Sequence, residues 1–164
     1  ATERFVADVI IKKYEHHLVG MNSRLDNIQA AVLNRKLEHL KSWTNTRQQR
    51  ANLYNKLLSK HERLKLPVNR FEEASHVYHL FVVRMIGINR DQLFEYLKAS
   101  GISPGLHYPL PINLQPGYTK TGSDKFLVSE TLSKEIISLP LCAHISENEI
   151  KFVCSEIDRF MKHA

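Results

Sequence analysis

The 164-residue chain is poor in cysteine and has no long hydrophobic run. Its two cysteines, Cys142 and Cys154, are too few for a disulfide framework and fit neither a CxxC nor a zinc pattern. The longest strictly apolar run, Leu80 to Val83, has four residues, whereas a membrane-spanning helix needs about 20. No basic-then-apolar leader opens the sequence. We therefore expect a soluble, cytoplasmic protein with no membrane partner.

Several motifs that mark catalytic sites are also missing. The sequence has no Gly-rich phosphate loop and no GxSxG elbow. His76 and His79 lie three residues apart in a β-rich stretch, so their side chains would point to opposite faces of a strand. Because no pair of Cys or His ligands has a second pair at a workable spacing, we expect no metal site.

The positive charge is concentrated in the first part of the chain. Residues 1–70 carry 14 Lys and Arg against 6 Asp and Glu, whereas residues 71–164 carry 9 against 11. This asymmetry suggests an anionic ligand or partner. The cations alternate with Leu and Asn at helical spacing, which fits a solvated helix face or a phosphorylated small molecule. The alternative is a nucleic acid, bound through Arg35, Lys36, Arg47 and Arg50.

The first half of the chain is predicted to be helical. Ser23 and Asp26 fit a capping box, so we expect a helix to start at Ser23. Apolar residues then recur at spacings of three and four, and neither Pro nor Gly interrupts them before Pro67. The pattern predicts one very long helix, or two with a bend at residues 42–46.

The second half is predicted to contain a small sheet with helices. Residues 76–86 read as a strand that is central, either covered on both faces or covered on one and flanked by strands. Short strands are expected at 102–107 and 137–139. One helix is expected to start after Asn89, as its N-cap, and to end at Gly101. A capping box from Ser146 to Glu149 is expected to start the last helix. The predicted class is α+β: a long helix followed by a small, mostly antiparallel sheet with helices packed on it.

Two segments carry candidate site residues. Gly20, Asn22 and Arg24 surround the predicted helix start, where free amides and the helix dipole favour an anion, although an ordinary helix cap uses the same residues. The second segment is the Pro-rich loop from Pro104 to Tyr118, which holds four of the six prolines. Its prolines keep the chain extended and stiff at His107 and Tyr108, whose side chains can donate to or accept from a polar ligand. The alternative is that Tyr108 packs under the loop and His107 caps a backbone carbonyl.

The run from Tyr14 to Ala31 contains the pattern GxNxRxxxxQAA, formed by Gly20, Asn22, Arg24 and residues 29–31. This run resembles the PLP-dependent sugar aminotransferases of the DegT/DnrJ/EryC1/StrS family. Further landmarks follow in the order that the family shows, and the resemblance extends from about Lys13 to the C-terminus. These landmarks are residues 37–40, Arg50-Ala51 with Tyr54, the strand 75–84, Gly101-Ile102, His107-Tyr108-Pro109 and residues 138–141.

The resemblance implies a fold-type I aminotransferase of deoxyamino-sugar and polysaccharide biosynthesis. In such enzymes pyridoxal 5'-phosphate carries an amino group, usually from glutamate, to a keto group on a nucleotide-linked sugar. They are homodimers with active sites at the subunit interface. By the same resemblance, Asn22 would contact the cofactor phosphate of the neighbouring subunit, and Arg24, His107 and Tyr108 would contact the sugar nucleotide.

The sequence departs from the family in one large respect. The family's Schiff-base lysine sits in a Ser-Phe-x-x-x-Lys frame, which is missing here, as are the pyridine-binding Asp and the ring-stacking aromatic. PLP chemistry needs that lysine. We therefore expect a C-terminal part of such an enzyme that does not transaminate alone and contributes no catalytic residue.

The expected domain organisation follows from this comparison. Residues 1–22 would be a remnant of the large domain or a linker, residues 23–66 a connecting helix or helix pair, and residues 67–164 the α+β small domain. Two rival functions remain open. One is a non-enzymatic dimerisation module that uses the apolar face of residues 25–58, and the other is the basic nucleic-acid binder.

Overall fold

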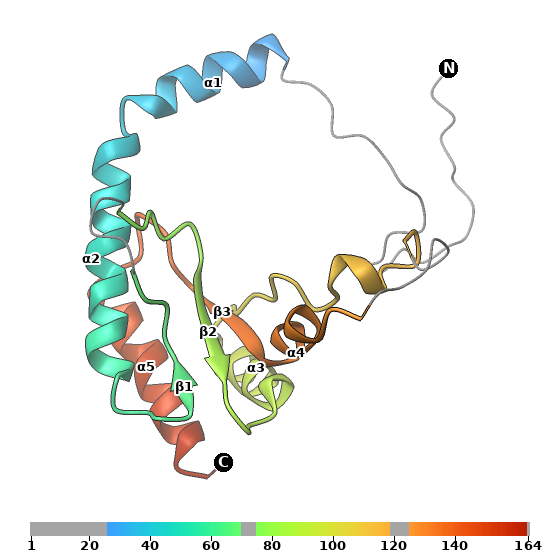
Figure 1. The fold of residues 1–164 in the computed structure, drawn as a ribbon. Helices are drawn as coiled ribbons and strands as arrows, with labels where there is room; N and C mark the ends of the chain where they lie inside the picture. The colour runs from blue at the N-terminus through green and yellow to red at the C-terminus, as the bar shows by residue number, and fades with distance from the viewer. Residues whose placement is uncertain (1–25, 70–74, 119–124, 164) are drawn as a thin grey trace.

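The computed structural model describes residues 26–69, 75–118 and 125–163 (Figure 1). The predicted α+β class is confirmed. In chain order the elements are α1 (Asn27–Leu37), α2 (Leu40–Leu58), β1 (Leu64–Lys65), β2 (Phe81–Met85), α3 (Arg90–Ala99), the 3₁₀ turn η1 (Ile112–Leu114), α4 (Leu127–Glu135), β3 (Ile136–Leu139) and α5 (Glu147–Met161).

The sheet has the strand order β1-β2-β3, and both pairs are antiparallel. β2 is therefore the central strand and is flanked by a strand on each side. This agrees with the second of the two predicted alternatives, a strand flanked by other strands. Its residues alternate between fully buried Phe81, Val83 and Met85 and half-buried Val82 and Arg84, the period of two that a strand imposes. The strand is shorter than predicted, because it begins only at Phe81.

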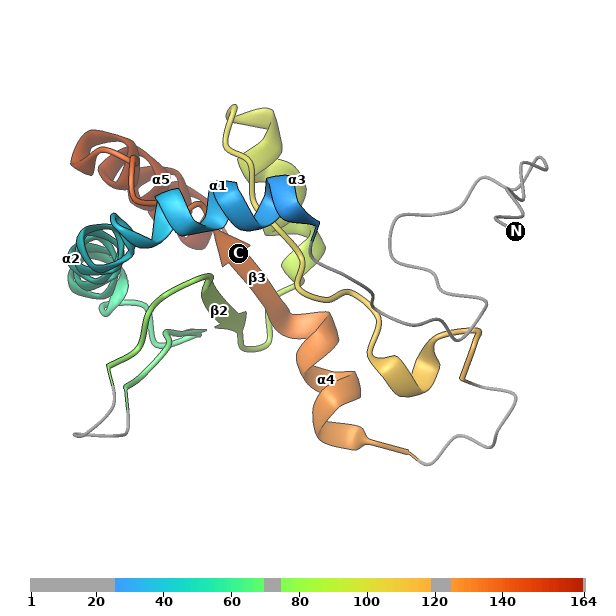
Figure 2. The same cartoon turned by 90° about the horizontal axis from the view of Figure 1, so that it is seen from above.

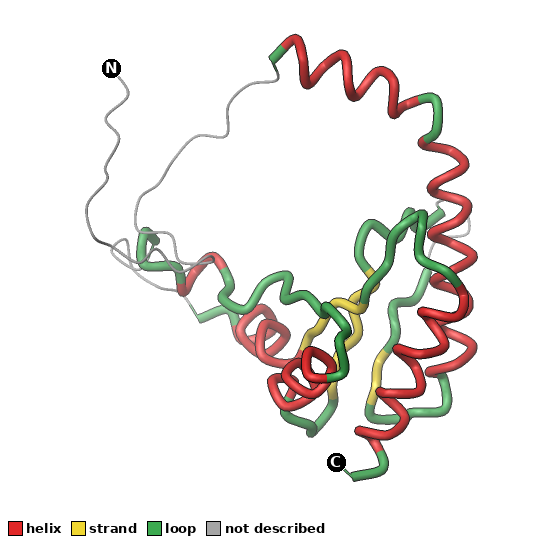
Figure 3. The backbone as a smooth tube through the Cα atoms, turned by 180° about the vertical axis from the view of Figure 1, so that it is seen from behind, coloured by secondary structure: helices red, strands yellow, loops and turns green. Residues whose placement is uncertain are grey.

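One hydrophobic core joins the sheet to the helices. The apolar stripe of α5 buries Ile150 and Ile157, and that of α2 buries Tyr54 and Leu58. The two helices lie alongside each other, and α3 packs on α5. Seen from behind, the strands lie between the α2–α5 pair and the helices α3 and α4 (Figure 3). Apolar burial on this scale is the main driving force for the fold.

The start of the first helix was predicted wrongly. Ser23 lies outside the described residues, but Asp26, the third helical residue of the expected capping box, is extended with φ −81° and ψ 166°. Asp26 is itself the N-cap, and its carboxylate accepts a hydrogen bond from the Gln29 amide at 2.8 Å. An Asp can cap a helix without a box, so the helix begins at Asn27.

The helical half is interrupted earlier than predicted, at Glu38 and His39 instead of residues 42–46. Ser42 and Thr46 are helical, and each hydroxyl donates to a backbone carbonyl of the preceding turn, at 2.8 and 3.1 Å, an arrangement in which a helix accommodates Ser and Thr. The helical pattern also predicted too much at its end, because α2 ends at Leu58 and β1 follows at Leu64–Lys65.

The capping signals of the second half are confirmed. The Asn89 side chain accepts from the Asp91 amide, Gly101 follows α3 with φ +76°, and Ser146 and Glu149 form the full capping box of α5. The strand expected at 102–107 is wrong, since only a single bridge forms there, from Gly105 to Ser138. Helix α4 was not predicted.

Helix α1 stands apart from the core. It extends from the start of α2 away from the sheet (Figures 1 and 2), and none of its residues is buried. Several of its large aliphatic side chains are therefore in water, with exposed fractions between 48% and 79%; these are Ile28, Val32, Leu33 and Leu37. A helix with apolar residues on more than one side is typical of an element enclosed by other structure.

Candidate functional site

The candidate site is built where the Pro-rich loop meets strand β3. Gly105 and Ser138 exchange two backbone hydrogen bonds, of 2.9 Å from the Gly105 amide and 2.8 Å from the Ser138 amide. This pairing holds the start of the loop against the sheet, and Ser138 is only 4% exposed. The position of the following residues, His107 and Tyr108, is set by this bridge.

His107 is anchored by the same serine. Its Nδ1 lies 2.9 Å from the Ser138 hydroxyl, and its ring packs over Gly105 so closely that a Cβ there would be 2.6 Å from Cε1. Tyr108 is 62% exposed, and its ring meets His107 edge to face, with centroids 5.6 Å apart. The alternative prediction, a packed Tyr108 and a His107 bound to a backbone carbonyl, is wrong.

Both residues line a cavity of about 270 Å³. Ligand pockets for whole small molecules usually measure roughly 300–1,000 Å³, so this cavity has room for one portion of a larger ligand. The other lining residues come from η1 and its approach, from α4 and from the start of β3; they are Leu110, Pro111, Ile112, Ser129, Leu132, Ser133 and Ile136. The lining of the cavity is thus mostly apolar, with a few polar side chains from His107, Tyr108 and two serines.

The other two predicted site residues, Asn22 and Arg24, lie outside the described residues. Two of the four cations proposed for nucleic acid, Arg47 and Arg50, are engaged in bonds between distant segments of the fold. Arg47 donates to the Val77 carbonyl at 3.0 Å, Arg50 donates to the Ile145 carbonyl at 3.0 Å and pairs with Glu147, and Arg35 pairs with Glu38. A side chain that already bridges two elements is poorly placed to contact phosphates.

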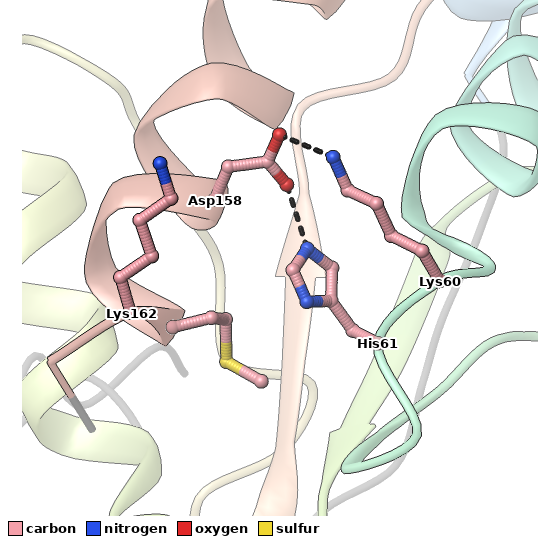
Figure 4. A pocket seen from close by; sticks show the side chains of 5 residues that line it. Lys60, His61, Asp158 and Lys162 are labelled. Atoms are coloured by element: carbon pink, nitrogen blue, oxygen red, sulfur yellow. Dashed lines mark hydrogen bonds and ion pairs between the residues drawn. The ribbon is translucent and has the colours of Figure 1, made fainter.

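A second cavity, of about 420 Å³, lies between the end of α2 and the end of α5 (Figure 4). Asp158 on α5 binds the Lys60 amine and the His61 Nε2, each at 2.6 Å, and Lys162 lines the same cavity. Lys60 and Lys162 follow helix C-termini, where the dipole is negative. The cluster is therefore explained as a clamp between two helix ends.

The titration behaviour of this cluster agrees with a structural role. Burial alone would raise the pKa of Asp158, but the hydrogen bonds and charges of Lys60 and His61 outweigh it and hold that pKa below its ordinary value. Burial raises the pKa of the neighbouring Cys154 thiol to about 12, so Cys154 is not a nucleophile at neutral pH.

A third cavity, of about 360 Å³, lies between α3 and α5 and is lined in part by Tyr96 and Arg159. Both contact buried Glu156, at 2.9 and 2.6 Å, so they act in packing the two helices. Within the described part of the chain, no group of three His, Cys, Asp or Glu could hold a metal ion. No helix of that same part is long and apolar enough to cross a membrane.

Sequence reasoning missed two residues of the site, Ser138 and Gly105. Both stand in segments that the motifs highlighted, but their partnership spans 33 positions and forms only when the loop pairs with β3. No local spacing rule connects a serine in a strand with a histidine in a distant loop. The signal present in the sequence was a glycine two residues before the histidine, which permits close approach of a ring.

Comparison with solved structures defines the class of fold. The chain is similar to Streptomyces venezuelae DesV, crystallised with a ketimine intermediate (TM-score 0.76, 34% identity, 92% of this chain and 40% of DesV). It is also similar to a DegT/DnrJ/EryC1/StrS aminotransferase from Brucella abortus (TM-score 0.73, 32% identity, 92% and 39%). The fold is thus that found in part of the fold-type I sugar aminotransferases.

The sequence relatives agree. The chain is 36% identical to the dTDP-3-amino-3,6-dideoxy-alpha-D-galactopyranose transaminase of Aneurinibacillus thermoaerophilus, over 91% of this chain and 40% of that protein. It is 38% identical to the dTDP-3-amino-3,4,6-trideoxy-alpha-D-glucose transaminase of S. venezuelae, over 82% and 35%. The profile of the DegT/DnrJ/EryC1/StrS aminotransferase family matches residues 6–158. The chain belongs to this family, and it spans about two fifths of the length of these relatives.

Proposed function

We propose that the chain supplies the substrate-side surface of a PLP-dependent aminotransferase that acts on a keto sugar nucleotide. The observation that carries this is the pair of half-buried His107 and exposed Tyr108, which line a cavity sized for part of a ligand, in a chain that belongs to a family of sugar aminotransferases. Imidazole and phenol groups donate to the hydroxyl, carbonyl and phosphate oxygens that a sugar nucleotide presents.

The described residues do not fit the cofactor itself. No lysine and no carboxylate lines the cavity beside His107, whereas PLP needs a lysine for its aldehyde and an acidic partner for its ring nitrogen. In the complete enzyme PLP supplies the electron sink for amino transfer. This chain performs no step of that chemistry. We infer that it is inactive by itself.

The roles left for this chain are binding roles. His107 and Tyr108 orient the sugar nucleotide, Arg24 pairs with its pyrophosphate through a bidentate fork, and Asn22 donates to the cofactor phosphate of a neighbouring subunit. The amino donor in this proposal is glutamate, and the assembly is a homodimer in the cytoplasm. Asn22 and Arg24 rest on the family pattern in the sequence, and His107 and Tyr108 also on the geometry of the loop.

Treatment of the purified chain with PLP and borohydride tests the cofactor part of the proposal. We expect only weak, scattered labelling of exposed lysines, because the described cavity beside His107 lacks an amine. Peptide mapping by mass spectrometry locates the labelled lysines. If one lysine carried a stoichiometric, reduced PLP adduct, the chain would bind PLP as an aldimine and the proposal would be overturned. A relative with the Ser-Phe-x-x-x-Lys frame is the positive control.

The exposed aliphatic residues of α1 favour a second candidate function, a non-enzymatic dimerisation module. Water does not favour a helix that exposes Ile28, Leu33 and Leu37 together. Both candidates predict a dimer, so sedimentation equilibrium over a hundredfold range of concentration distinguishes them only together with an assay of nucleotide-sugar binding. A tight dimer that Leu37→Lys dissociates, in a chain that binds no nucleotide sugar, would favour the module.

A further inference from the structure

The contact between Ser138 and His107 determines which ring nitrogen carries the proton. The Ser138 hydroxyl and Nδ1 of His107 are 2.9 Å apart, a distance that allows two arrangements. Either the hydroxyl donates to an unprotonated Nδ1, or a protonated Nδ1 donates to the hydroxyl oxygen. The two arrangements present opposite chemistry at Nε2, the nitrogen on the other side of the ring.

The burial of Ser138 distinguishes between them. His107 is the one partner of the Ser138 hydroxyl within the described residues, and Ser138 is 4% exposed. If Nδ1 donated, the hydroxyl proton of Ser138 would be buried with no acceptor, and buried donors are rarely left unpaired. If the hydroxyl donates, the contact pairs the serine proton and the nitrogen lone pair at once.

We propose that Ser138 is a positioning residue that fixes neutral His107 in the tautomer with its proton on Nε2. No described residue bonds Nε2, and His107 lines the cavity of about 270 Å³. Nε2–H is therefore a donor held ready for an acceptor oxygen of a ligand. On the proposed function, that acceptor is a hydroxyl, carbonyl or phosphate oxygen of the sugar nucleotide.

Gly105 completes the support for the ring. A Cβ at position 105 would lie 2.6 Å from Cε1 and 3.2 Å from Nδ1 of His107, so any larger residue displaces the imidazole. Gly105 and Ser138 are themselves paired through two backbone hydrogen bonds. One bridge therefore fixes the hydroxyl that binds Nδ1 and the flat surface on which the ring rests.

Long-range ¹H–¹⁵N correlation spectra of the full 164-residue chain, recorded without ligand at a pH where His107 is neutral, test the proposal. We expect a single tautomer in which Nε2 is protonated. The Nδ1 signal is expected at lower frequency than in Ser138→Ala, because a nitrogen that accepts a hydrogen bond is shielded. Ser138→Ala should also convert the ring to a mixture of both tautomers, and Ser138→Thr, which keeps a hydroxyl, should restore the single form.

Ser133→Ala is the matched control, since this buried serine lines the same cavity but donates to the Glu130 carbonyl; its His107 spectrum should be unchanged. Gly105→Ala should behave like Ser138→Ala. A protonated Nδ1 in the unmodified chain overturns the proposal, even if every variant fails to fold. An unchanged His107 spectrum in folded Ser138→Ala also overturns it. Neither readout uses substrate or cofactor, so failure of the aminotransferase proposal leaves this test intact.

Discussion

The phenol oxygen of Tyr54 lies 2.9 Å from the carbonyl oxygen of Pro140. This bond links α2 to the residue that follows β3, two positions from Ser138 and across 86 residues of sequence. Tyr54 is fully buried and stacks on Phe81 of the central strand. Tyr54 thereby holds α2 against β3, the strand whose Ser138 contacts His107.

Removal of this hydroxyl is expected to destabilise the domain. In Tyr54→Phe the ring still stacks on Phe81, but the Pro140 carbonyl loses its donor, at a cost of about 1–2 kcal/mol in the free energy of unfolding. Burial raises the pKa of Tyr54 above its ordinary value, so the phenol stays a neutral donor throughout the usual pH range. Urea titration measures the loss, and equal midpoints for the two proteins would contradict the assigned bond.

The capping box of α5 is expected to matter measurably for stability. Ser146→Ala removes the hydroxyl that accepts from the Glu149 amide, which costs about 1 kcal/mol at a typical N-cap. Ser155→Ala, within the same helix, is the matched control, because its hydroxyl only donates back to the Phe152 carbonyl and Ala is the better helix former. Thermal unfolding should therefore separate the two variants, with Ser146→Ala the less stable.

The clamp at Asp158 predicts a dependence of stability on pH. The folded pKa of this carboxyl is depressed, so its contribution is complete above the unfolded pKa of about 3.9. That contribution is lost as the pH falls through the lower, folded pKa. Asp158→Asn should cost about 1 kcal/mol at pH 7, since the pair is partly exposed.

The difference between wild type and Asp158→Asn should then shrink as the solution is acidified below about pH 4. Denaturant titrations from pH 7 to pH 3 measure it. Glu62→Gln, which changes an exposed carboxylate with no described partner, is the control and should change little at any pH. A gap for Asp158→Asn that stays constant down to pH 3 would show that the carboxylate is not stabilised by its partners.

The fold could be predicted where the signals are local. Asn89, Gly101 and Ser146 act through residues within four positions, and each cap formed as its sequence indicated. The helix start at Asn27 was missed because Ser23 and Asp26 are both good caps and nearby sequence does not rank them. β1 was missed because two residues carry no periodicity, and the strand exists only through its pairing with β2.

The same distinction applies to the site. His107 and Tyr108 were predicted because the prolines and the family pattern single them out in one short segment. Ser138 and Gly105 were not, since their roles depend on a bridge between distant segments. The bonding partners of the basic residues also could not be predicted from the sequence, because the carbonyl acceptors of Arg47 and Arg50 lie 30 and 95 residues away.

A chimeric enzyme tests the central claim most directly. In the S. venezuelae dTDP-3-amino-3,4,6-trideoxy-alpha-D-glucose transaminase, which is 38% identical to this chain, the matching segment is replaced by this chain, and amino transfer is measured with the host's own sugar nucleotide. We expect transfer by the chimera and none by the chain alone. His107→Ala in the chimera should lower kcat/KM about tenfold, or ~1.4 kcal/mol. Transfer by the chain alone, or a folded, PLP-bound chimera without transfer, would contradict the account.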